Sequence, residues 1–332
     1  MAVDERTVDG RAAADVVFAG LDRREYHQLT RELTGYCYRM LGSPFDAEDA
    51  VQETMVRAWR NQEQFEGRSS LRTWLYRIAT NVCIDMLRHR GRRVVPMDLQ
   101  SPSTVDEMRV PTTLPEHEWV LPVPDAWIGG EEADPAQRVI SRETVRLAFV
   151  AAIQRLTPRQ RAVLILRDVL QFSAAESAEL LGTTVASANS ALQRARVAVP
   201  GSAEADDAGA SDNGPLLDEY VTAFESYDMS KLTSLLRSDA IQSMPPFEIW
   251  LRGADEIVQF MLGPGAECRG SRLIPTSANG CAAFGQYRSD GQGGHKPWGL
   301  QVIETDGSRI SAVHCFVLMP ELFPLFGLPP HP

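Results

Sequence analysis

Residues 67–93 read GRSSLRTWLYRIATNVCIDMLRHRGRR, and they concentrate positive charge on one predicted helix. They contain seven arginines and one carboxylate, although the 332-residue chain has a formal net charge of −11. At about 100° per residue, one face of this helix is apolar and consists of Leu71, Leu75, Ile78, Val82 and Met86. The pattern predicts an amphipathic helix that begins near Ser69 and packs into a core through this face.

A second stripe of the same helix lies about 100° away and carries Trp74, Arg77, Asn81 and Arg88. Arginine neutralises phosphates, an aromatic ring stacks on an unpaired base, and asparagine can bind a base edge. We interpret this stripe as a surface for nucleic acid. The alternative is a solvated basic face with Trp74 turned into the core.

Charge alternates along the chain. Residues 68–93 have seven arginines against one carboxylate, a net +6, and residues 98–134 have one arginine against nine carboxylates, a net −8. Residues 138–199 have nine arginines against four carboxylates, a net +5, and residues 200–332 have eight cations against seventeen carboxylates, a net −9. Two basic modules are therefore separated by an acidic stretch and followed by an acidic module.

Composition argues against several classes of protein. No run of about 18 apolar residues is present, so we expect no membrane span. The first residues, MAVDERTVDGRAAADVV, lack the basic-then-apolar order of a signal peptide. The five cysteines form no Cys-x-x-Cys pair, which argues against a zinc site or a disulfide framework and for a reducing cytoplasm. We expect a cytoplasmic protein without metal or cofactor.

Periodicity and composition predict a multidomain chain. The predicted segments are an N-terminal extension (1–24), an all-α domain (25–95), an acidic Pro-rich linker (96–137), a second all-α domain (138–199), a flexible linker (200–213) and an α+β domain (214–332). In the last segment, two amphipathic helices accompany strands separated by Gly, Asn and Asp turns, which is typical of helices packed on a curved antiparallel sheet.

The second all-α domain contains SAAESAELLGTTVASANSALQRAR at 173–196. Gly182 permits a tight turn between two crossing helices, and the small Ala178 permits their close packing. The second of these helices presents six polar side chains outward: Ser187, Asn189, Ser190, Gln193, Arg194 and Arg196. The pattern predicts a helix-turn-helix whose second helix enters the major groove. The alternative is two helices of an ordinary bundle.

Four blocks occur in an order that a known family shares: DAEDAVQETMVRAWR (46–60), FEGRSSLRTWLYRIATNVCIDMLRHRGRR (65–93), LTPRQRAVLILRDVLQFSAAESAELLG (156–182) and ALQRAR (191–196). With them the chain resembles a sigma factor of the extracytoplasmic-function (ECF) class in the sigma-70 family. The C-terminal module, with ANGCAAFGQYR and PWGLQVIE, resembles a cone-shaped SnoaL-like domain of the nuclear-transport-factor-2-like fold. The EWVLPVPDAW and FPLFGLP segments make the combination similar to the SigG-like group.

The resemblance implies partners and sites. The partners would be the RNA polymerase core, through its β′ clamp and β subunit, and promoter DNA. The helix 46–60 would dock on the clamp through Asp49, Gln52, Glu53 and Trp59; the alternative is a solvated acidic face. The −10 element would be captured and melted, and its phosphates bound, by Phe65, Arg68, Ser69, Ser70, Trp74, Arg77, Asn81, Arg88, Arg90, Arg92 and Arg93. The helix-turn-helix would bind the −35 element.

The resemblance also implies a role for the acidic Pro-rich linker (96–137). In the family, the segment between the two DNA-binding modules threads the basic active-site cleft and RNA exit channel of the polymerase, where a net charge of −8 would mimic nucleic acid. The alternative is an unstructured tether. One departure concerns the recognition helix: Ser187-Ala188-Asn189-Ser190 stands where the family often has Thr-Val-Lys-Ser, so one phosphate contact is missing and the −35 preference is open.

SnoaL-like folds enclose a conical pocket. Strand alternation and placement nominate as its lining Met244, Phe247, Trp250, Phe260, Tyr287, Trp298, Gln301, His314 and Phe316. His314 lies on an apolar strand with no titratable partner nearby in sequence, so we expect a core residue rather than a catalyst, and no enzyme. The domain is expected to modulate the sigma factor, by sensing a ligand or by packing on the helical domains; an anti-sigma partner is another route of regulation.

Two other classes of function stay open from the sequence. One is a one-component helix-turn-helix regulator with a ligand-binding C-terminal domain, which would bind its operator without polymerase. The other is a polyketide-cyclase-like enzyme with DNA-binding attachments, whose isolated C-terminal domain would turn over a substrate.

Overall fold

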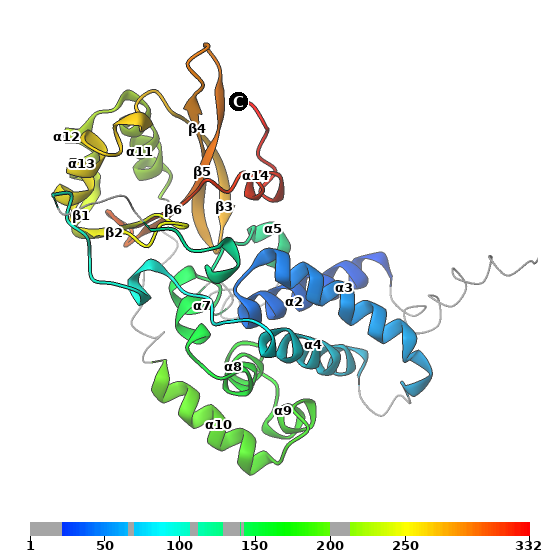
Figure 1. Ribbon diagram of the computed structural model, residues 1–332. Helices are drawn as coiled ribbons and strands as arrows, with labels where there is room; N and C mark the ends of the chain where they lie inside the picture. The colour runs from blue at the N-terminus through cyan, green and yellow to red at the C-terminus, as the bar shows by residue number, and fades with distance from the viewer. Residues whose placement is uncertain (1–21, 66–69, 107–111, 129–139, 141–142, 200–212) are drawn as a thin grey trace, which may run out of the picture. The chain divides into compact units, whose positions relative to one another are not determined.

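The structure is a computed structural model that describes residues 22–65, 70–106, 112–128, 140, 143–199 and 213–332 (Figure 1). The predicted −10 residues Arg68 and Ser69 lie outside the described residues. The chain divides into two compact units. The first comprises residues 1–92, 126–144 and 152–200, and the second comprises residues 93–125, 145–151 and 201–332.

The first unit begins with three helices: α2 (Arg23–Leu41), α3 (Pro44–Arg60) and α4 (Leu71–Arg88). Local sequence sets their ends. Asp22 and Glu25 form a capping box at the start of α2, and Gly42 ends this helix in the left-handed conformation with φ 73°. Ser43 then caps α3, which starts with proline at its first position, where a missing N–H does no harm.

These three helices share a core. The predicted apolar face of α4 is buried at Leu75 and Val82 and half-buried at its other three positions. Tyr36 of α2 packs edge-to-face on Tyr76 of α4 with ring centroids 5.3 Å apart, and its hydroxyl bonds the Thr80 hydroxyl at 2.7 Å. The aromatic pair thus fixes α2 on α4 by both packing and a buried hydrogen bond.

The remaining helices of this part are α5 (Asp125–Ile128), α7 (Leu147–Gln154), α8 (Pro158–Leu164), α9 (Ala174–Leu180) and α10 (Val185–Ala198), with a π-helical turn at Ile165–Val169. Residues of α5 and α7 are divided between the two units. Thr157 and Gln160 form a capping box at the start of α8, as the Thr157-Pro158 pair predicts for a helix start. Gly182, with φ 57°, turns the chain between α9 and α10 and forms the helix-turn-helix.

Within the first unit, the helices of residues 25–95 pack against those of residues 152–199, which the sequence predicts as separate domains. Phe172 lies edge-to-face on Tyr76 at 5.3 Å between ring centroids, and the Arg72 guanidinium lies 5.0 Å from the centroid of the Phe172 ring. Gln154 Nε2 donates to the Arg39 carbonyl at 3.2 Å. Aromatic packing and hydrogen bonds to the backbone therefore join the two helical sets.

The second unit is built on a six-stranded sheet with the order β2-β1-β6-β5-β4-β3. Its strands are β1 (Leu236–Ser243), β2 (Trp250–Arg252), β3 (Arg272–Ala278), β4 (Cys281–Ser289), β5 (His295–Thr305) and β6 (Ile310–Val317). Neighbouring strands are antiparallel except for the parallel pair of β1 and β6.

Helices flank this sheet. They are α11 (Gly214–Ser226), α12 (Met229–Leu235), α13 (Ala254–Leu262) and α14 (Leu322–Leu325), with a 3-10 turn at Ala266–Cys268. Figure 1 shows α11, α12 and α13 on one side of β4 and β5, and α14 on the other. One apolar core joins the first three helices to the sheet. The expected α+β fold of the C-terminal domain is confirmed, and its sheet is mixed rather than wholly antiparallel.

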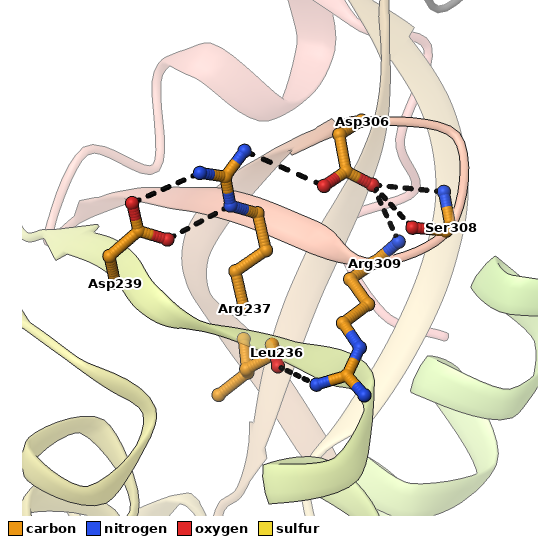
Figure 2. Close-up of polar contacts among 6 residues, drawn as sticks. All are labelled: Leu236, Arg237, Asp239, Asp306, Ser308 and Arg309. Atoms are coloured by element: carbon orange, nitrogen blue, oxygen red, sulfur yellow. Dashed lines mark hydrogen bonds and ion pairs between the residues drawn. The ribbon is translucent and has the colours of Figure 1, made fainter.

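The turn between β5 and β6 is held by one carboxylate (Figure 2). Asp306 Oδ1 accepts hydrogen bonds from the Ser308 amide at 3.0 Å, the Ser308 hydroxyl at 2.9 Å and the Arg309 amide at 2.9 Å. Its other oxygen accepts from Arg237 of β1 at 3.5 Å, and Arg237 also forms a forked ion pair with Asp239. The turn is thereby connected to the neighbouring strand β1.

Residues 93–125 differ from the predicted extended linker. In their described part they form 3-10 turns at Pro96–Asp98 and Glu116–Glu118 and lie on the α+β domain of the second unit. Thr113 forms an antiparallel bridge with Phe247, and the Val123 amide donates to Asn279 Oδ1 at 3.0 Å. Four apolar side chains are at most 1% exposed: Trp119, Val120, Leu121 and Val123. The burial of these side chains and the backbone contacts with the domain show that the described part of the segment is not an extended tether.

Among the described residues, no helix is both long enough and apolar enough to cross a bilayer.

Candidate nucleic-acid interface

The exposed edge of α4 carries the predicted −10 residues. Ser70 caps the helix, its Oγ accepting from the Thr73 amide at 3.1 Å. Arg77 and Asn81 are exposed one turn apart. Trp74 is half-buried and packs on Phe65, with ring centroids 5.2 Å apart. The edge therefore presents a cation and an amide beside an aromatic pair at the start of the helix.

The arginines after α4 have different surroundings. Arg88 is exposed and pairs with Asp85 at 2.9 Å, and Arg90 is exposed and pairs with Asp46 of α3. Arg92 is exposed as well. Arg93 is only 6% exposed and its guanidinium donates to the Trp119 carbonyl at 2.7 Å. The expectation that all four meet phosphates is therefore corrected for this conformation: Arg93 is buried and bound to a backbone carbonyl.

One face of α3 carries the predicted polymerase-binding residues. Asp49 and Gln52 are exposed, Trp59 is 40% exposed, and Glu53 is half-buried with a 2.7 Å ion pair to Arg57. The opposite face is buried at Ala47, Ala50, Val51, Thr54 and Ala58.

Sequence reasoning missed Val56, which is 40% exposed and lies three residues before Trp59 on the same face. The sequence does indicate it, because Val56 and Trp59 are two large apolar residues three positions apart that lie outside the buried stripe of α3. Together, Val56 and Trp59 give this acidic face an exposed apolar centre, which is typical of a protein-binding surface.

The recognition helix α10 presents all six predicted residues to solvent, and each of them is exposed: Ser187, Asn189, Ser190, Gln193, Arg194 and Arg196. Thr184 caps the helix, and Ala188, Leu192 and Ala195 pack inward. Arg196 forms a forked ion pair with Asp168, with contacts of 3.0 and 2.6 Å.

Arg167, which lies on the π-helical turn, lines a surface hollow together with Asn189, Gln193 and Arg196. Sequence reasoning missed it because the turn brings it beside α10 only through tertiary packing. It adds a cation to the surface expected to meet DNA.

The C-terminal domain encloses a cavity of about 350 Å³ between the sheet and the helices α11, α12 and α13. Five of the predicted lining residues belong to its wall: Met244, Phe247, Phe260, Trp298 and Gln301. Sequence reasoning missed the wall residues Gln242, Gln286 and Arg288. Strand alternation could have predicted Gln286 and Arg288, because they flank Tyr287 on β4 and so face the opposite side of the sheet.

Four predicted lining residues lie outside the cavity wall, which corrects that expectation. His314 and Phe316 alternate with the wall residues Val313, Cys315 and Val317 along β6 and so face the other side of the sheet. The same alternation turns Tyr287 away, where its ring packs on Phe323 and its hydroxyl donates to the Pro329 carbonyl at 2.6 Å. Trp250 instead donates from Nε1 to the Gln100 carbonyl at 2.9 Å.

His314 has partners that its sequence neighbourhood does not reveal. Its Nδ1 lies 2.8 Å from the Ser243 hydroxyl, and its Nε2 lies 3.6 Å from Glu304 Oε1. Burial raises the pKa of Glu304, but His314 and Arg146 outweigh it and hold that pKa below its ordinary value. Ser243 and His314 are 2% and 8% exposed, so this group is enclosed within the domain. His314 occupies a core position.

The described residues contain no group of three or more His, Cys, Asp or Glu side chains that could hold a metal ion.

Comparison with known proteins places these features in one family. Residues 26–93 match the model of Sigma-70 region 2, and residues 146–199 match the model of Sigma-70, region 4. The ECF RNA polymerase sigma factor SigG of Mycobacterium tuberculosis (strain H37Rv) is 45% identical over 314 residues, which cover 90% of this chain and 81% of SigG. SigJ of the same strain is 30% identical over 250 residues, which cover 72% of each chain.

Among solved structures, the crystal structure of Mycobacterium tuberculosis extracytoplasmic function sigma factor SigJ matches with a TM-score of 0.59 and 25% identity, covering 93% of this chain and all of that one. The chain belongs to the ECF RNA polymerase sigma factors of the sigma-70 family. The expected family, the two helical sigma regions and an α+β C-terminal domain are confirmed. The protein therefore works with core RNA polymerase on promoter DNA.

Proposed function

We propose that the exposed edge of α4 melts and captures the −10 element. The observation that carries this proposal is the grouping of Arg77 and Asn81 beside the Phe65–Trp74 pair, on a helix followed by exposed arginines. Unstacking a base step costs a few kcal/mol, and a site that holds the flipped base returns part of that cost. The exposed arginines Arg88, Arg90 and Arg92 would exchange their present partners for backbone phosphates.

Region 4 would then bind the −35 element as duplex. Asn189 and Gln193 carry amides that can bind base edges, and Arg194 and Arg196 can bind phosphates. Gln193 and Arg196 share the hollow with Arg167, so this cation would add a phosphate contact where the family's lysine is absent. We propose that this region would contact the β subunit of the polymerase.

The face of α3 defined by Asp49, Gln52, Val56 and Trp59 would bind the β′ clamp. Its apolar centre supplies contact area, and its acidic rim supplies complementarity to a basic partner. The half-buried Glu53 is already paired with Arg57, so it contributes less than Asp49.

The C-terminal domain would modulate this activity through residues 93–125. In polymerase these acidic residues would occupy the basic cleft, whereas here they lie on the α+β domain. The two locations compete for the same segment, so the strength of its binding to the domain would set how readily the sigma factor engages polymerase. In this scheme the domain catalyses no reaction, and the protein acts in the cytoplasm, where polymerase meets the chromosome.

In vitro transcription tests these assignments, with purified protein, core polymerase and genomic fragments on which start sites are mapped. We expect Arg77→Ala with Asn81→Ala to keep core binding and lose open complexes, measured by permanganate reactivity of unpaired thymines. We expect Asp49→Ala with Gln52→Ala to lose core binding in a co-elution assay. Trp74→Ala with Asn81→Ala should also lose open complexes.

The exposed Arg23 on α2 provides the matched control, because Arg23→Ala removes one cation away from these surfaces. Full transcription by the two α4 double variants would refute the −10 assignment, and full core binding by the α3 double variant would refute the clamp assignment. Specific, tight promoter binding without polymerase would favour a one-component regulator instead.

A further inference from the structure

We propose that the cavity of the C-terminal domain binds a small, uncharged, mostly apolar molecule that carries an amide-like or carbonyl group, and that it holds this molecule without converting it. This inference goes beyond promoter recognition and does not depend on the residue roles assigned to α3, α4 and α10.

The body of the cavity is apolar. Its volume of about 350 Å³ lies in the range of sites for small organic molecules. Aromatic and aliphatic side chains from both the helices and the sheet line it, among them Phe224, Met244, Phe260, Trp298, Val313 and Val317. A space of this kind favours a flat or branched hydrocarbon skeleton, because burial of apolar surface drives its binding.

Amide and hydroxyl groups form a chain along one wall. The Tyr220 hydroxyl donates to Gln301 Oε1 at 2.8 Å, Gln301 Nε2 donates to Gln286 Oε1 at 2.9 Å, and Gln286 Nε2 donates to Ser271 Oγ at 3.1 Å. Each amide nitrogen has two N–H bonds, and these contacts use one of them. The chain fixes the orientation of the two glutamines and leaves donor capacity at the wall.

Gln242 is the observation that points most directly to a ligand. It belongs to the cavity wall and is only 6% exposed, yet its amide makes no side-chain hydrogen bond with the described residues. An amide at a cavity wall without a hydrogen-bond partner in the protein has its donors and its acceptor available to a bound molecule. A bound molecule with both an acceptor and a donor would satisfy its N–H and carbonyl groups together.

The charges at the wall favour an uncharged ligand. The charged lining residues are Arg288 and Glu267, which pair at 3.0 Å. The Arg288 guanidinium also stacks on Trp298, 3.4 Å from the ring centroid. The Arg288 Nε is buried without a hydrogen-bond partner among the described residues, so it can donate to a neutral acceptor of a ligand. The charge of Arg288 is already balanced by Glu267, so an ionic ligand would lose its hydration without gaining a free counter-charge.

The wall also lacks, among the described residues, a group suited to proton transfer. Burial raises the pKa of the Cys315 thiol well above its ordinary value, so the thiolate is disfavoured. Glu267 is held by Arg288, and its side chain is 83% exposed at the edge of the domain. His314 faces the other side of the sheet. Because general acid–base catalysis needs a base within reach of the substrate, the cavity is suited to binding alone.

Binding in the cavity would reach the acidic segment through Phe247. This wall residue forms a backbone bridge with Thr113. The next residue, Glu248, donates its amide to the Thr112 carbonyl at 3.1 Å. The backbone of the segment is thus paired with the chain that follows β1, next to the cavity wall.

A further hydrogen bond holds the same part of the segment. The Leu114 amide donates to the Pro246 carbonyl at 3.1 Å, so the turn after β1 holds the segment by its backbone on both sides of Thr113. A ligand that packs on Phe247 therefore stabilises the turn on which the segment lies, and binding is expected to tighten the segment on the domain.

The test uses the full-length protein and prodan, a neutral naphthalene ketone whose emission shifts to the blue in apolar surroundings. We expect saturable binding with a blue shift. Competition then compares 2-naphthamide with 2-naphthoate, which has nearly the same shape but carries a charge, and with 2-methylnaphthalene, which lacks polar groups. We expect 2-naphthamide to displace prodan at least about tenfold better than either of the other two, which corresponds to about 1.4 kcal/mol.

Two variants locate the site. Gln242→Leu keeps the volume of the wall and removes the amide, so it should abolish the preference for 2-naphthamide over 2-methylnaphthalene. Cys315→Met places a larger side chain in the cavity and should weaken the binding of prodan itself. Gln259 lies on the exposed side of α13, outside the cavity, so Gln259→Leu is the control with the same chemical change. This variant should change neither the preference for 2-naphthamide over 2-methylnaphthalene nor the affinity for prodan.

Three results would overturn the proposal: no blue-shifted binding of prodan, equal displacement by 2-naphthamide and 2-naphthoate, or variants at 242 and 315 that behave like Gln259→Leu. None of these results would affect the transcription assay, so the two proposals fail separately.

Discussion

Arg161 lies in a basic, helix-forming sequence and yet is only 3% exposed. Its guanidinium donates to the carbonyls of Ile153, Gln154 and Leu156 at 3.0, 2.9 and 3.3 Å, and to the Met40 carbonyl on α2. Burial lowers the pKa of Arg161 to about 10, which still leaves the side chain charged at neutral pH. The residue therefore acts as a buried cross-link between the end of α2 and the start of α8.

We expect Arg161→Leu to destabilise the first unit by about 3 kcal/mol, because several buried carbonyls lose their donor at once. Urea unfolding followed by circular dichroism measures the change. Arg159→Leu, two residues earlier and exposed, is the matched control and should stay within about 0.5 kcal/mol of the wild type. Equal stability of the two variants would contradict the cross-linking role.

The burial of Arg161 and Arg93 could not be predicted from the sequence. An arginine in a basic stretch is most simply interpreted as a surface cation, and nothing nearby in sequence indicates the carbonyl that receives it. The acceptors at Met40 and Trp119 are 121 and 26 residues away. In contrast, exposure of Arg77 and Asn81 follows from helical periodicity alone, which is why that part of the site could be predicted.

At the scale of elements, local signals predicted the helices well. The Thr157-Pro158 start, the Gly42 stop and the Gly182 turn are each set by residues within a few positions of the boundary. Residues 93–125 were not predicted to be ordered, because their partners are backbone groups near 246–250 and the Asn279 side chain, far along the chain. The apolar character of Trp119 and its neighbours was the one local sign.

The turn at Asp306 provides a prediction with a pH dependence. Hydrogen bonds from the Ser308 and Arg309 backbone, with the ion pair to Arg237, hold the pKa of Asp306 below its ordinary value. A carboxyl group whose pKa is lower in the folded protein stabilises the fold above its ordinary pKa, near about 3.9, and loses that contribution as the pH falls through the folded value. We expect Asp306→Ala to cost about 1–2 kcal/mol at pH 7.

This cost should diminish as the pH falls below about 4, and thermal unfolding at a series of pH values measures it. Asp218→Ala on α11 is the control, since this carboxylate is exposed and should change stability by less than about 0.5 kcal/mol. A difference between Asp306→Ala and the wild type that stays constant down to about pH 2 would contradict the assignment to the ionised carboxylate.

At the scale of the molecule, regions 2 and 4 pack together in the first unit, whereas the promoter elements that they are proposed to bind are well separated. The −10 and −35 elements are centred roughly 25 base pairs apart, or about 85 Å along the duplex at about 3.4 Å per pair. Helices in contact through Tyr76 and Phe172 cannot reach both elements at once. If regions 2 and 4 bind these elements as proposed, they would have to separate for both to be bound at once.

We expect Phe172→Ala to favour this separation, because it removes the ring contacts with Tyr76 and Arg72. Small-angle scattering should show a larger radius of gyration, and open complexes should form faster, by up to about tenfold for about 1.4 kcal/mol of lost contact energy. Phe172→Leu retains apolar volume and should show a smaller change of both quantities. An unchanged radius in Phe172→Ala would show that other contacts hold the regions together.

The burial of Trp119, Val120, Leu121 and Val123, in a segment whose backbone contacts the C-terminal domain, has a consequence for the exchange of domains between such chains. Grafting experiments should therefore exchange residues 93–125 together with the C-terminal domain. A chimaera that receives only the segment or only the domain would expose apolar surface to solvent and aggregate.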